Sequence, residues 1–583
     1  MSHTTLADQL LEVLLYAGVK RIYGVVGDSL NPLVDAVRRT DRVEWVHVRN
    51  EEAGAFAAAA EAQLTGQLAV CAGSVGPGNT HLVNGVYDAY RTGEPVLAIA
   101  SHIPSSQVGT GFFQETHPER LFLDCSDYLE IVSQAEQMPR IPRIAVQHAL
   151  TRPGVSVLVI SGDVLHRDVA NPTGTSAVVP STAVATPRHE NVEALAERLN
   201  AAQTVTLFCG AGTEGAHDEV MQLAAKLSSP IGHTLRGKEW IQYDNAFDVG
   251  MSGLLGYGAC YDACHEAELL VMLGTDFPYD DFLPGARTVQ VDHDPARLGK
   301  RTPIELGVHG DVGATLRALL PKVKQKGDRS FLDEMLRKHA KALEHVVEAY
   351  THEIEHHTPI HPEYAAKILD DVAADDAVFT VDTGMCNVWA ARYLTPNGRR
   401  RVIGSFRHGS MANALPHAMG AQLAYPGRQV ISMSGDGGLG MLLGELLTLA
   451  KYNLPVKVVT FNNSSLGMVE LEMMVDGFPA SETDNGSFDY SAIAKAVGIH
   501  SVRVEQPADV RGALGEALAH PGPALVDLVT DPKALSIPPH ITGRQVKGFA
   551  LAGGKIVLDG GVGEMVELAR ANVRNIPRPA IAR

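Results

Sequence analysis

The chain has 583 residues, which is too long for a single hydrophobic core and predicts about three or four domains. Hydrophobic residues make up 45% of the chain, and no uninterrupted apolar run approaches the roughly 20 residues that a membrane span needs. Lys and Arg number 49 against 67 Asp and Glu, for a formal charge of −18, and this acidic balance argues against nucleic acid as a partner.

The amino terminus and the cysteines indicate the compartment. The first residues have an amphipathic helix pattern that contains Asp8 and Glu12 but no basic segment, so no signal peptide is expected. The six cysteines form no CxxC pair, which predicts free thiols in a reducing compartment rather than a metal cluster. These cysteines are Cys71, Cys125, Cys209, Cys260, Cys264 and Cys386. We therefore expect a cytoplasmic protein.

Residues 1–175 alternate helix and strand, which predicts a first doubly wound parallel sheet. The expected helices cover residues 4–17, 30–38, 51–64 and 80–90, and the expected strands cover residues 43–48, 68–72, 96–100 and 155–160. Residues 171–188 are rich in Pro, Thr, Ser and Ala and read as a linker.

Glu51 and Glu52 stand at a strand-to-helix junction in this first domain. An acid in the first helical turn is ordinarily favoured by the helix dipole, and this reading suits Glu52. The small residues that follow Glu51 predict a helix that packs deeply in a subunit interface.

Residues 190–340 form the second predicted domain. Residues 205–208 read as a strand that leads into Gly210-Ala211-Gly212-Thr213-Glu214-Gly215, a GxGxxG pattern that is weak by itself. Further Gly, Thr and Asp positions end strand-like runs in residues 234–240, 250–256, 273–281 and 291–295. They would line one sheet edge with room for a large nucleotide. The alternative is a Rossmann-like domain that has lost its ligand.

A charged helical stretch and a His/Pro-rich segment lead to the third domain. A metal site could be built from His356, His357 and His361, but the prolines between them and the lack of further ligands favour a solvated linker.

Residues 355–530 form the third predicted domain and contain a βαβ unit in which a polar residue that could bind a cation follows each strand. Strands at 431–434 and 456–460 flank one helical pattern, so Asp436 and Asn463 would emerge at the same carboxyl edge of a parallel sheet. Their hard oxygen ligands suit Mg²⁺ or Ca²⁺. Gly435, Gly437 and Gly438 let the backbone approach a diphosphate, and no Lys follows them, so the motif is not a P-loop.

The sequence GDG, 24 residues and then NN is the signature of thiamine-diphosphate (ThDP) enzymes. Further motifs are VGDSLN at 26–31, CAGSVGPGN at 71–79, HIPSS at 102–106, GFFQETHPE at 111–119, LRGKE at 235–239 and HGSMANA at 408–414. Over nearly its whole length the chain resembles the FAD-containing ThDP enzymes that oxidise pyruvate, and most closely the pyruvate:quinone oxidoreductases. The resemblance implies three α/β domains and a carboxyl-terminal segment at 531–583.

The resemblance also implies a role for each matching position. Glu51 would hydrogen-bond N1′ of the aminopyrimidine, Met411 would hold the cofactor in its V shape, and the Gly409 carbonyl would accept from the aminopyrimidine. Asp436, Asn463 and the Ser465 carbonyl would bind Mg²⁺. The implied catalytic residues are Glu51, Phe113, Gln114 and Met468, the last at a position where relatives commonly carry an aromatic residue. The implied ThDP contacts are Glu51, Gly409, Ser410, Met411, Asp436, Gly437, Gly438, Asn463, Ser464, Ser465, Leu466, Gly467, Met468 and Val469.

FAD would lie in extended form across the second domain. The implied contacts are Gly210, Arg236, Met251, Ser252, Gly253, Leu254, Thr275, Asp276, Phe277, Pro278, Tyr279, Asp292, His293, Asp294, Pro295 and Ala296.

The implied reaction is oxidative decarboxylation of pyruvate through a ThDP enamine, with electrons passing through FAD to a membrane quinone. Four arginines and no acid from Arg570 to Arg583, and a stripe of Met565, Val566, Ala569 and Val573, predict a tail that docks on the inner face of the cell membrane. A homo-oligomer is implied, at least a dimer and by family a tetramer. The alternatives are an acetolactate synthase-like carboligase with structural FAD, a phosphate-dependent pyruvate oxidase, and a nucleotide-binding regulatory paralogue.

Overall fold

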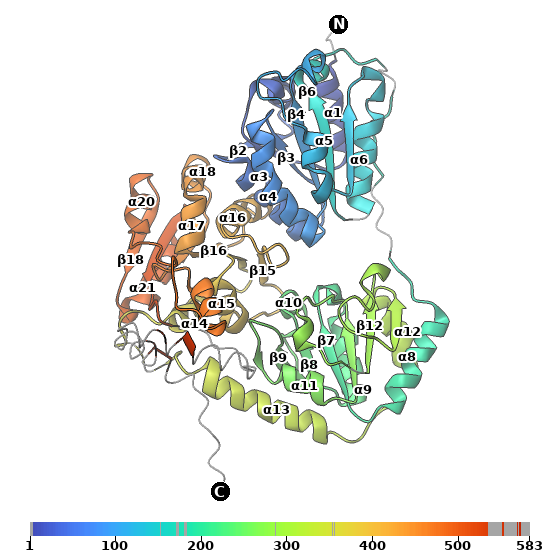
Figure 1. Ribbon diagram of the computed structural model, residues 1–583, viewed down its shortest axis with the longest axis vertical. Coiled ribbons are helices and arrows are strands. Elements are labelled where there is room, and N and C mark those ends of the chain that lie inside the picture. The colour runs from blue at the N-terminus through green and yellow to red at the C-terminus, as the bar shows by residue number, and fades with distance from the viewer. Residues whose placement is uncertain are drawn as a thin grey trace.

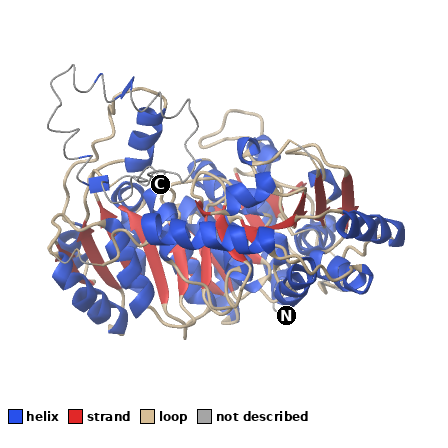
Figure 2. Cartoon of the chain, turned by 90° about the horizontal axis from the view of Figure 1, so that it is seen from below, coloured by secondary structure: helices blue, strands red, loops and turns tan. Residues whose placement is uncertain are grey.

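Three α/β units follow one another along the chain, each built on one sheet of mainly parallel strands (Figure 1). The computed structural model describes residues 4–151, 153–170, 174–179, 184–285, 287–352, 354 and 356–534, and also residues 551, 552, 555, 568, 571 and 572. Helices cover both faces of the strands, as the view in Figure 2 shows. The predicted fold class, three parallel-sheet α/β domains, is confirmed.

The first sheet has the strand order β2-β1-β3-β4-β6-β5, and all its pairings are parallel. Its strands are β1 (Arg21–Gly24), β2 (Glu44–His47), β3 (Ala69–Gly73), β4 (Val96–His102), β5 (Tyr128–Val132) and β6 (Val155–Ser161). Its helices are α1 (Leu6–Tyr16), α2 (Asn31–Thr40), α3 (Glu51–Thr65), α4 (Pro77–Thr92), α5 (Pro118–Leu121), α6 (Arg140–Thr151) and α7 (Gly162–Leu165). The central strands β3, β4 and β6 are buried along their whole length and mainly apolar, as is typical of strands covered on both faces.

The second sheet has the order β10-β9-β8-β7-β11-β12-β13. Its strands are β7 (Val205–Cys209), β8 (Ile231–His233), β9 (Asp248–Met251), β10 (Tyr257–Gly258), β11 (Leu269–Leu273), β12 (Thr288–Asp292) and β13 (Leu306–His309). Its helices are α8 (His189–Ala201), α9 (His217–Leu227), α10 (Lys238–Ile241), α11 (Cys260–Glu266) and α12 (Val312–Leu319), and α13 (Ser330–Ala342) leads to the third unit. The short edge strand β10 runs antiparallel to β9, and the other pairings of this sheet are parallel.

The third sheet has the order β15-β14-β16-β17-β19-β18 and parallel pairings throughout. Its strands are β14 (Val378–Val381), β15 (Arg401–Gly404), β16 (Val430–Gly435), β17 (Lys457–Asn462), β18 (His500–Val504) and β19 (Ala524–Val529). Its helices are α14 (Pro362–Val372), α15 (Met385–Tyr393), α16 (Ala414–Ala424), α17 (Asp436–Met441), α18 (Leu446–Tyr452), α19 (Gly467–Val475), α20 (Tyr490–Ala496) and α21 (Val510–Ala519).

The connection between β16 and β17 is broken into two helices rather than one. A 3-10 turn, Leu443–Glu445, separates α17 from α18. The carboxylate of Glu445 accepts the main-chain N–H groups of Arg49, at 2.9 Å, and Asn50, at 3.0 Å, so this turn is fastened to the first unit. The expected continuous apolar face is also wrong at Met441, whose side chain is exposed.

The histidine-rich linker is less solvated than predicted. His361 is buried, and its ring stacks on Tyr350 with 3.9 Å between the ring centroids. Within the described part of the chain, no group of three His, Cys, Asp or Glu side chains is placed to hold a metal ion. The six cysteines are free, as predicted, and all of them are buried.

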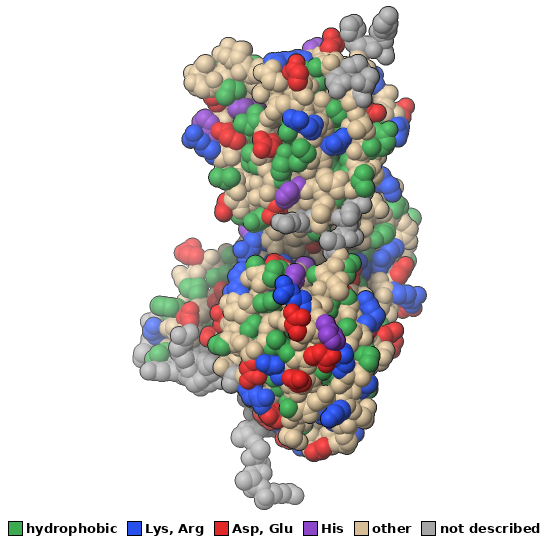
Figure 3. Space-filling view, turned by 90° about the vertical axis from the view of Figure 1, so that its right-hand side faces the viewer, with side chains coloured by type: hydrophobic (Ala, Val, Ile, Leu, Met, Phe, Trp, Pro, Cys, Tyr) green, Lys and Arg blue, Asp and Glu red, His purple; other side chains and the backbone are tan. Residues whose placement is uncertain are grey.

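Two surface features complete the fold. Among the helices described, none combines the length and the apolar content that crossing a bilayer requires. On the face drawn in Figure 3, charged side chains of both signs are interspersed, and a hollow separates the first unit from the parts of the chain below it.

Helix α3 joins the first unit to the third within one chain. Its small side chains are covered by α4 and by α16. A Cβ added at Gly420 of α16 would lie 2.1 Å from the carbonyl oxygen of Ala57 in α3. One face of this helix therefore lies against α16 of its own chain, and its packing in a subunit interface stays a prediction.

Replacement of Gly420 by Ala should lower the thermal midpoint of unfolding. Overpacking of this kind costs about 1–3 kcal/mol, because backbone must move to admit the methyl group. A matched control is Gly515→Ala in α21, where an added Cβ meets nothing within 4 Å. Scanning calorimetry of both variants checks the prediction, and equal midpoints for Gly420→Ala and the wild type would contradict it.

Candidate functional site

The carboxyl ends of β16 and β17 bring Asp436 and Asn463 together. Asp436 begins α17 directly after β16, and Asn463 follows β17, which pairs in parallel with β16. The main-chain N–H of Asn463 faces the carboxylate of Asp436 and acts to lower its pKa. The side-chain amide of Asn485 donates to the same carboxylate at 3.1 Å. The two strand ends therefore form one polar site.

Burial sets the electrostatics of this site. Asp436 is 2% exposed, and burial raises the pKa of its carboxyl to about 6, although hydrogen bonds from Asn485 and from main-chain amides oppose the shift. Burial also raises the pKa of Asp382, which follows β14, to about 7. A Cβ at Gly438 would lie 1.7 Å from the Asp382 carboxylate, so this position admits only glycine. Buried carboxylates of this kind are stabilised by a cation.

The loop from Asn463 to Leu466 is held in a defined shape. Ser464 has a φ of 54°, and its carbonyl accepts from the N–H of Asn485 at 2.9 Å. The N–H of Ser465 donates to the Asn463 side-chain oxygen at 3.2 Å, and the N–H of Leu466 donates to the carbonyl of Thr483 at 2.9 Å. The segment 483–485 therefore buttresses the loop.

The other residues expected at ThDP surround this loop. Gly467, Met468 and Val469 form the first turn of α19, and Gly409, Ser410 and Met411 lie between β15 and α16. A Cβ at Gly437 would meet Leu466 at 2.7 Å and Met411 at 3.2 Å, so these side chains converge on the glycine turn. Carboxylate and amide oxygens beside close-packed glycines fit a magnesium-bound diphosphate.

Glu51 is the first residue of α3 and is 6% exposed. Its carboxylate lies 2.9 Å from Nδ1 of His81 in α4. Glu52 instead accepts from Asn84 at 2.7 Å, and Asn84 also donates to Ser410 at 2.9 Å. The two neighbouring acids therefore have different partners, and the described contacts of Glu51 come from its own unit.

Three residues of these sites were missed in the sequence. His81 and Asn84 lie one turn apart on α4, and their relation to Glu51 and Glu52 follows only from the packing of α3 on α4. Asn485 lies in an irregular segment after α19, where no periodic pattern points to Asp436.

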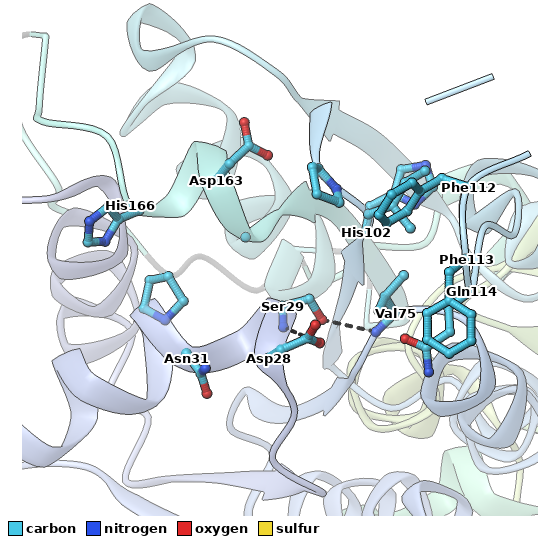
Figure 4. Close-up of a pocket in the computed structure, with 14 residues that line it drawn as sticks. Asp28, Ser29, Asn31, Val75, His102, Phe112, Phe113, Gln114, Asp163 and His166 are labelled. Carbon is cyan, nitrogen blue, oxygen red and sulfur yellow. Dashed lines mark hydrogen bonds between the residues drawn. The ribbon is translucent and has the colours of Figure 1, made fainter. Parts of the chain in front are cut away.

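Phe113 and Gln114 border a cavity of about 350 Å³ in the first unit (Figure 4). Phe113 is 78% exposed, and Gln114 has a φ of 64°. The carboxylate of Glu115 fastens their loop by accepting the N–H groups of Gly111, at 2.6 Å, and Phe112, at 3.1 Å. The loop therefore presents an aromatic side chain and an amide at the mouth of a cavity.

His102 also lines this cavity, and Figure 4 shows it beside Phe112. It is buried, its Nδ1 has no hydrogen-bond partner among the described residues, and burial lowers the pKa of its ring.

The residues expected at FAD gather at one edge of the second sheet. Each group follows the carboxyl end of a different strand: β7 (Gly210), β8 (Arg236), β9 (Met251, Ser252, Gly253, Leu254), β11 (Thr275, Asp276, Phe277, Pro278, Tyr279) and β12 (Asp292, His293, Asp294, Pro295, Ala296). The strand order reverses between β7 and β11, which is where open α/β sheets bind ligands. A Cβ at Gly210 would lie 2.6 Å from the carbonyl of Gly274, so the two strand ends approach closely there.

Two buried polar atoms at this edge fit a nucleotide. The Ser252 hydroxyl and Oδ2 of Asp292 have no hydrogen-bond partner among the described residues. Asp292 is fully buried, and burial raises the pKa of its carboxyl. Hydroxyl groups of a ribose or ribityl chain would satisfy such atoms.

The second and third units meet through residues of both sites. Arg407 lies two residues before Gly409, and its guanidinium contacts the Asp276 carboxylate at 2.8 Å. The loop after β11 is thereby tied to the segment between β15 and α16.

Comparison with known proteins assigns the family. Three family profiles match, described as the N-terminal TPP binding domain (residues 4–121), the central domain (residues 192–319) and the C-terminal TPP binding domain (residues 382–528) of thiamine pyrophosphate enzymes.

Curated relatives extend over most of the chain. A putative thiamine pyrophosphate-containing protein of Bacillus subtilis is 36% identical over 94% of this chain and 96% of its own length. A pyruvate oxidase of Lactiplantibacillus plantarum is 30% identical over 89% of this chain and 87% of its own. An acetolactate synthase large subunit of Parasynechococcus marenigrum is 32% identical over 90% and 87%. Because the profiles and these full-length matches agree with the geometry at Asp436 and Asn463, the chain belongs to the thiamine pyrophosphate enzyme family.

Proposed function

We propose that this enzyme oxidises pyruvate and water to acetate and CO₂, and passes two electrons through FAD to a membrane quinone. The observation that carries the proposal is the placement of Asp436 and Asn463 at the carboxyl ends of adjacent parallel strands, which suits a magnesium-bound diphosphate. The buried, unpartnered Ser252 hydroxyl and Asp292 oxygen support FAD in the second unit. The similarity to a pyruvate oxidase supports pyruvate as substrate.

In this proposal Asp436, the Asn463 side chain and the Ser465 carbonyl hold Mg²⁺. When bound, ThDP supplies an electron sink for decarboxylation and FAD accepts an electron pair. Gly409 and Met411 orient the aminopyrimidine. Glu51 holds a proton at N1′, and His81, 2.9 Å away, fixes the carboxylate.

Phe113 and Gln114 border the reacting carbon of pyruvate. The largely exposed Phe113 ring is placed to exclude water from that carbon, and the Gln114 amide is placed to hydrogen-bond the substrate.

The complete site draws on two chains. Because the described contacts of Glu51 are with its own unit, we propose that its cofactor is held by Asp436 and Asn463 of a second copy. The exposed Phe113 would then be covered by that copy. A homodimer is the smallest active form, and two dimers would make a tetramer.

The segment 531–583 is proposed to bring a cytoplasmic enzyme to the inner face of the cell membrane. Its few described residues pack on α19, where Ala552 and Leu568 form a cluster with Leu471 and Met474. The amphipathic stripe of Met565, Val566, Ala569 and Val573 lies outside the described residues.

Glu51→Gln should keep both cofactors but lose about 10²–10⁴-fold in decarboxylation, because an amide cannot exchange a proton with N1′. The matched control is Glu52→Gln, which keeps an oxygen for Asn84 and should remain active. Single-turnover CO₂ release with measured ThDP and FAD contents checks this. A fully active Glu51→Gln protein would refute the role.

Anaerobic mixing with pyruvate separates oxidation from carboligation. An oxidoreductase should bleach its flavin stoichiometrically and form acetate, since FAD accepts the electron pair. Stopped-flow absorbance and product analysis by NMR measure both. Unbleached flavin with acetolactate as product would favour an acetolactate synthase-like enzyme, and acetyl phosphate formed only with inorganic phosphate would favour a phosphate-dependent oxidase.

Asp436→Asn should stabilise the metal-free protein at neutral pH and abolish its response to Mg²⁺ and ThDP. The pKa of about 6 lies above the ordinary value of 3.8 for an Asp carboxyl, so burial of the charge lowers the free energy of unfolding as pH rises through this window, by up to about 3 kcal/mol. Conversely, metal stabilisation of the wild type should grow as pH rises through about 6.

Differential scanning fluorimetry between about pH 5 and pH 8 measures both effects. The control is Asp375→Asn, whose carboxylate is 77% exposed. A Mg²⁺-dependent rise in the midpoint of Asp436→Asn would count against the assignment of this ligand.

A further inference from the structure

The loop from Asn463 to Leu466 has an anchor that the proposed function does not use. Glu470 lies one turn into α19 and is 4% exposed. One oxygen of its carboxylate, Oε2, accepts the Ser465 hydroxyl at 3.0 Å. The other, Oε1, accepts from Nζ of Lys533 at 3.1 Å. A buried carboxylate thus joins the loop to a residue beyond the last strand.

Lys533 is itself held in place from several sides. Thr530 bridges Ile360 in parallel, and the N–H of Asp531 donates to the Ile360 carbonyl at 2.9 Å. The N–H of Lys533 donates to the Asp531 carboxylate at 2.9 Å, and its carbonyl accepts from the Asn572 amide at 2.8 Å. The ammonium therefore comes from an ordered segment, so the pair with Glu470 is geometrically defined.

A charge pair buried in this way is sensitive to the loss of either member. Removal of one partner leaves the other charge without compensation in a poorly solvated place. The Glu470 carboxylate also accepts the hydroxyl of Ser465, and the carbonyl of this same residue is assigned to Mg²⁺. The remaining anchors of the loop, through Ser464, Leu466 and Asn463, are bonds that involve main-chain groups and do not include the Glu470 side chain.

We propose that Glu470, held by Lys533, is a positioning residue that sets the Ser465 end of the loop for the magnesium-bound diphosphate. The inference rests on the proposed ThDP and Mg²⁺ site and adds residues that neither the family motif nor the direct ligand set contains. Partners that orient metal ligands typically contribute about 10–100-fold in metal affinity. Because segment 483–485 still buttresses the loop, the loss should appear in cofactor binding rather than in folding.

The test measures the Mg²⁺ dissociation constant in the presence of saturating ThDP, by isothermal titration calorimetry on the full-length protein. Glu470→Ala, Lys533→Met and Ser465→Ala should each raise it about 10-fold or more. The Glu470→Ala/Ser465→Ala double variant should be little worse than either single variant, because both remove the same hydrogen bond.

Glu266→Ala is the matched control. It breaks an ion pair with Lys338 at 2.7 Å in the second unit, remote from this loop in the chain, and should leave the Mg²⁺ constant unchanged. Far-UV circular dichroism and FAD content establish that each variant is folded. If Glu470→Ala fails to fold, Lys533→Met, which keeps the carboxylate, decides the question.

Unchanged Mg²⁺ affinity in folded Lys533→Met and Glu470→Ala proteins would overturn the positioning role and leave the proposed function intact. Fully additive losses in the double variant would also overturn it, since Glu470 and Ser465 would then act independently. Wild-type protein without any Mg²⁺-dependent ThDP binding would instead remove the proposed function, and the inference with it.

Discussion

The parallel pairing of β16 with β17 is the constraint on which the rest of the structure depends. It places Asp436 and Asn463 at one edge, where the main-chain N–H of Asn463 faces the Asp436 carboxylate. The cost of burying that carboxylate is offset only in part by the Asn485 amide and by main-chain donors. A cation would complete the compensation, so the site is built for a ligand that carries one.

The contacts that hold the units together also connect their sites. Glu445 fastens the turn after α17 to the main chain directly before Glu51, and Arg407 ties the segment before Gly409 to Asp276 of the second unit. Packing of α3 on α16 is so close that Gly420 cannot carry a side chain without displacing backbone. Displacement of one unit would therefore disturb residues assigned to ThDP and residues assigned to FAD together.

Central strands and their ends were predictable, whereas edges and irregular segments were not. Strands such as β4 and β16 are mainly apolar, and the parallel βαβ rule places Asp436 beside Asn463 without further information. The edge strands β5, β15 and β18 are only partly buried and lack a clear apolar pattern, so sequence alone did not reveal them. The break between α17 and α18 depends on a contact with Arg49 and Asn50, which are distant in the chain.

The supporting residues of the site could not be predicted either, because their roles also depend on contacts between residues that are distant in the chain. Asn485, His81 and the Glu470–Lys533 pair act through tertiary contacts, and local spacing carries no sign of them. Family motifs name direct ligands, but the residues that fix those ligands belong to the particular fold of this chain.

The most direct test of the central claim is a crystal structure of the full-length protein grown with ThDP and Mg²⁺. The account predicts Mg²⁺ bound by Asp436, Asn463 and the Ser465 carbonyl at about 2.1 Å, with Glu51 of a second subunit at N1′ of the same cofactor. A cofactor bound away from the ends of β16 and β17, or a protein that takes up no thiamine derivative, would contradict it.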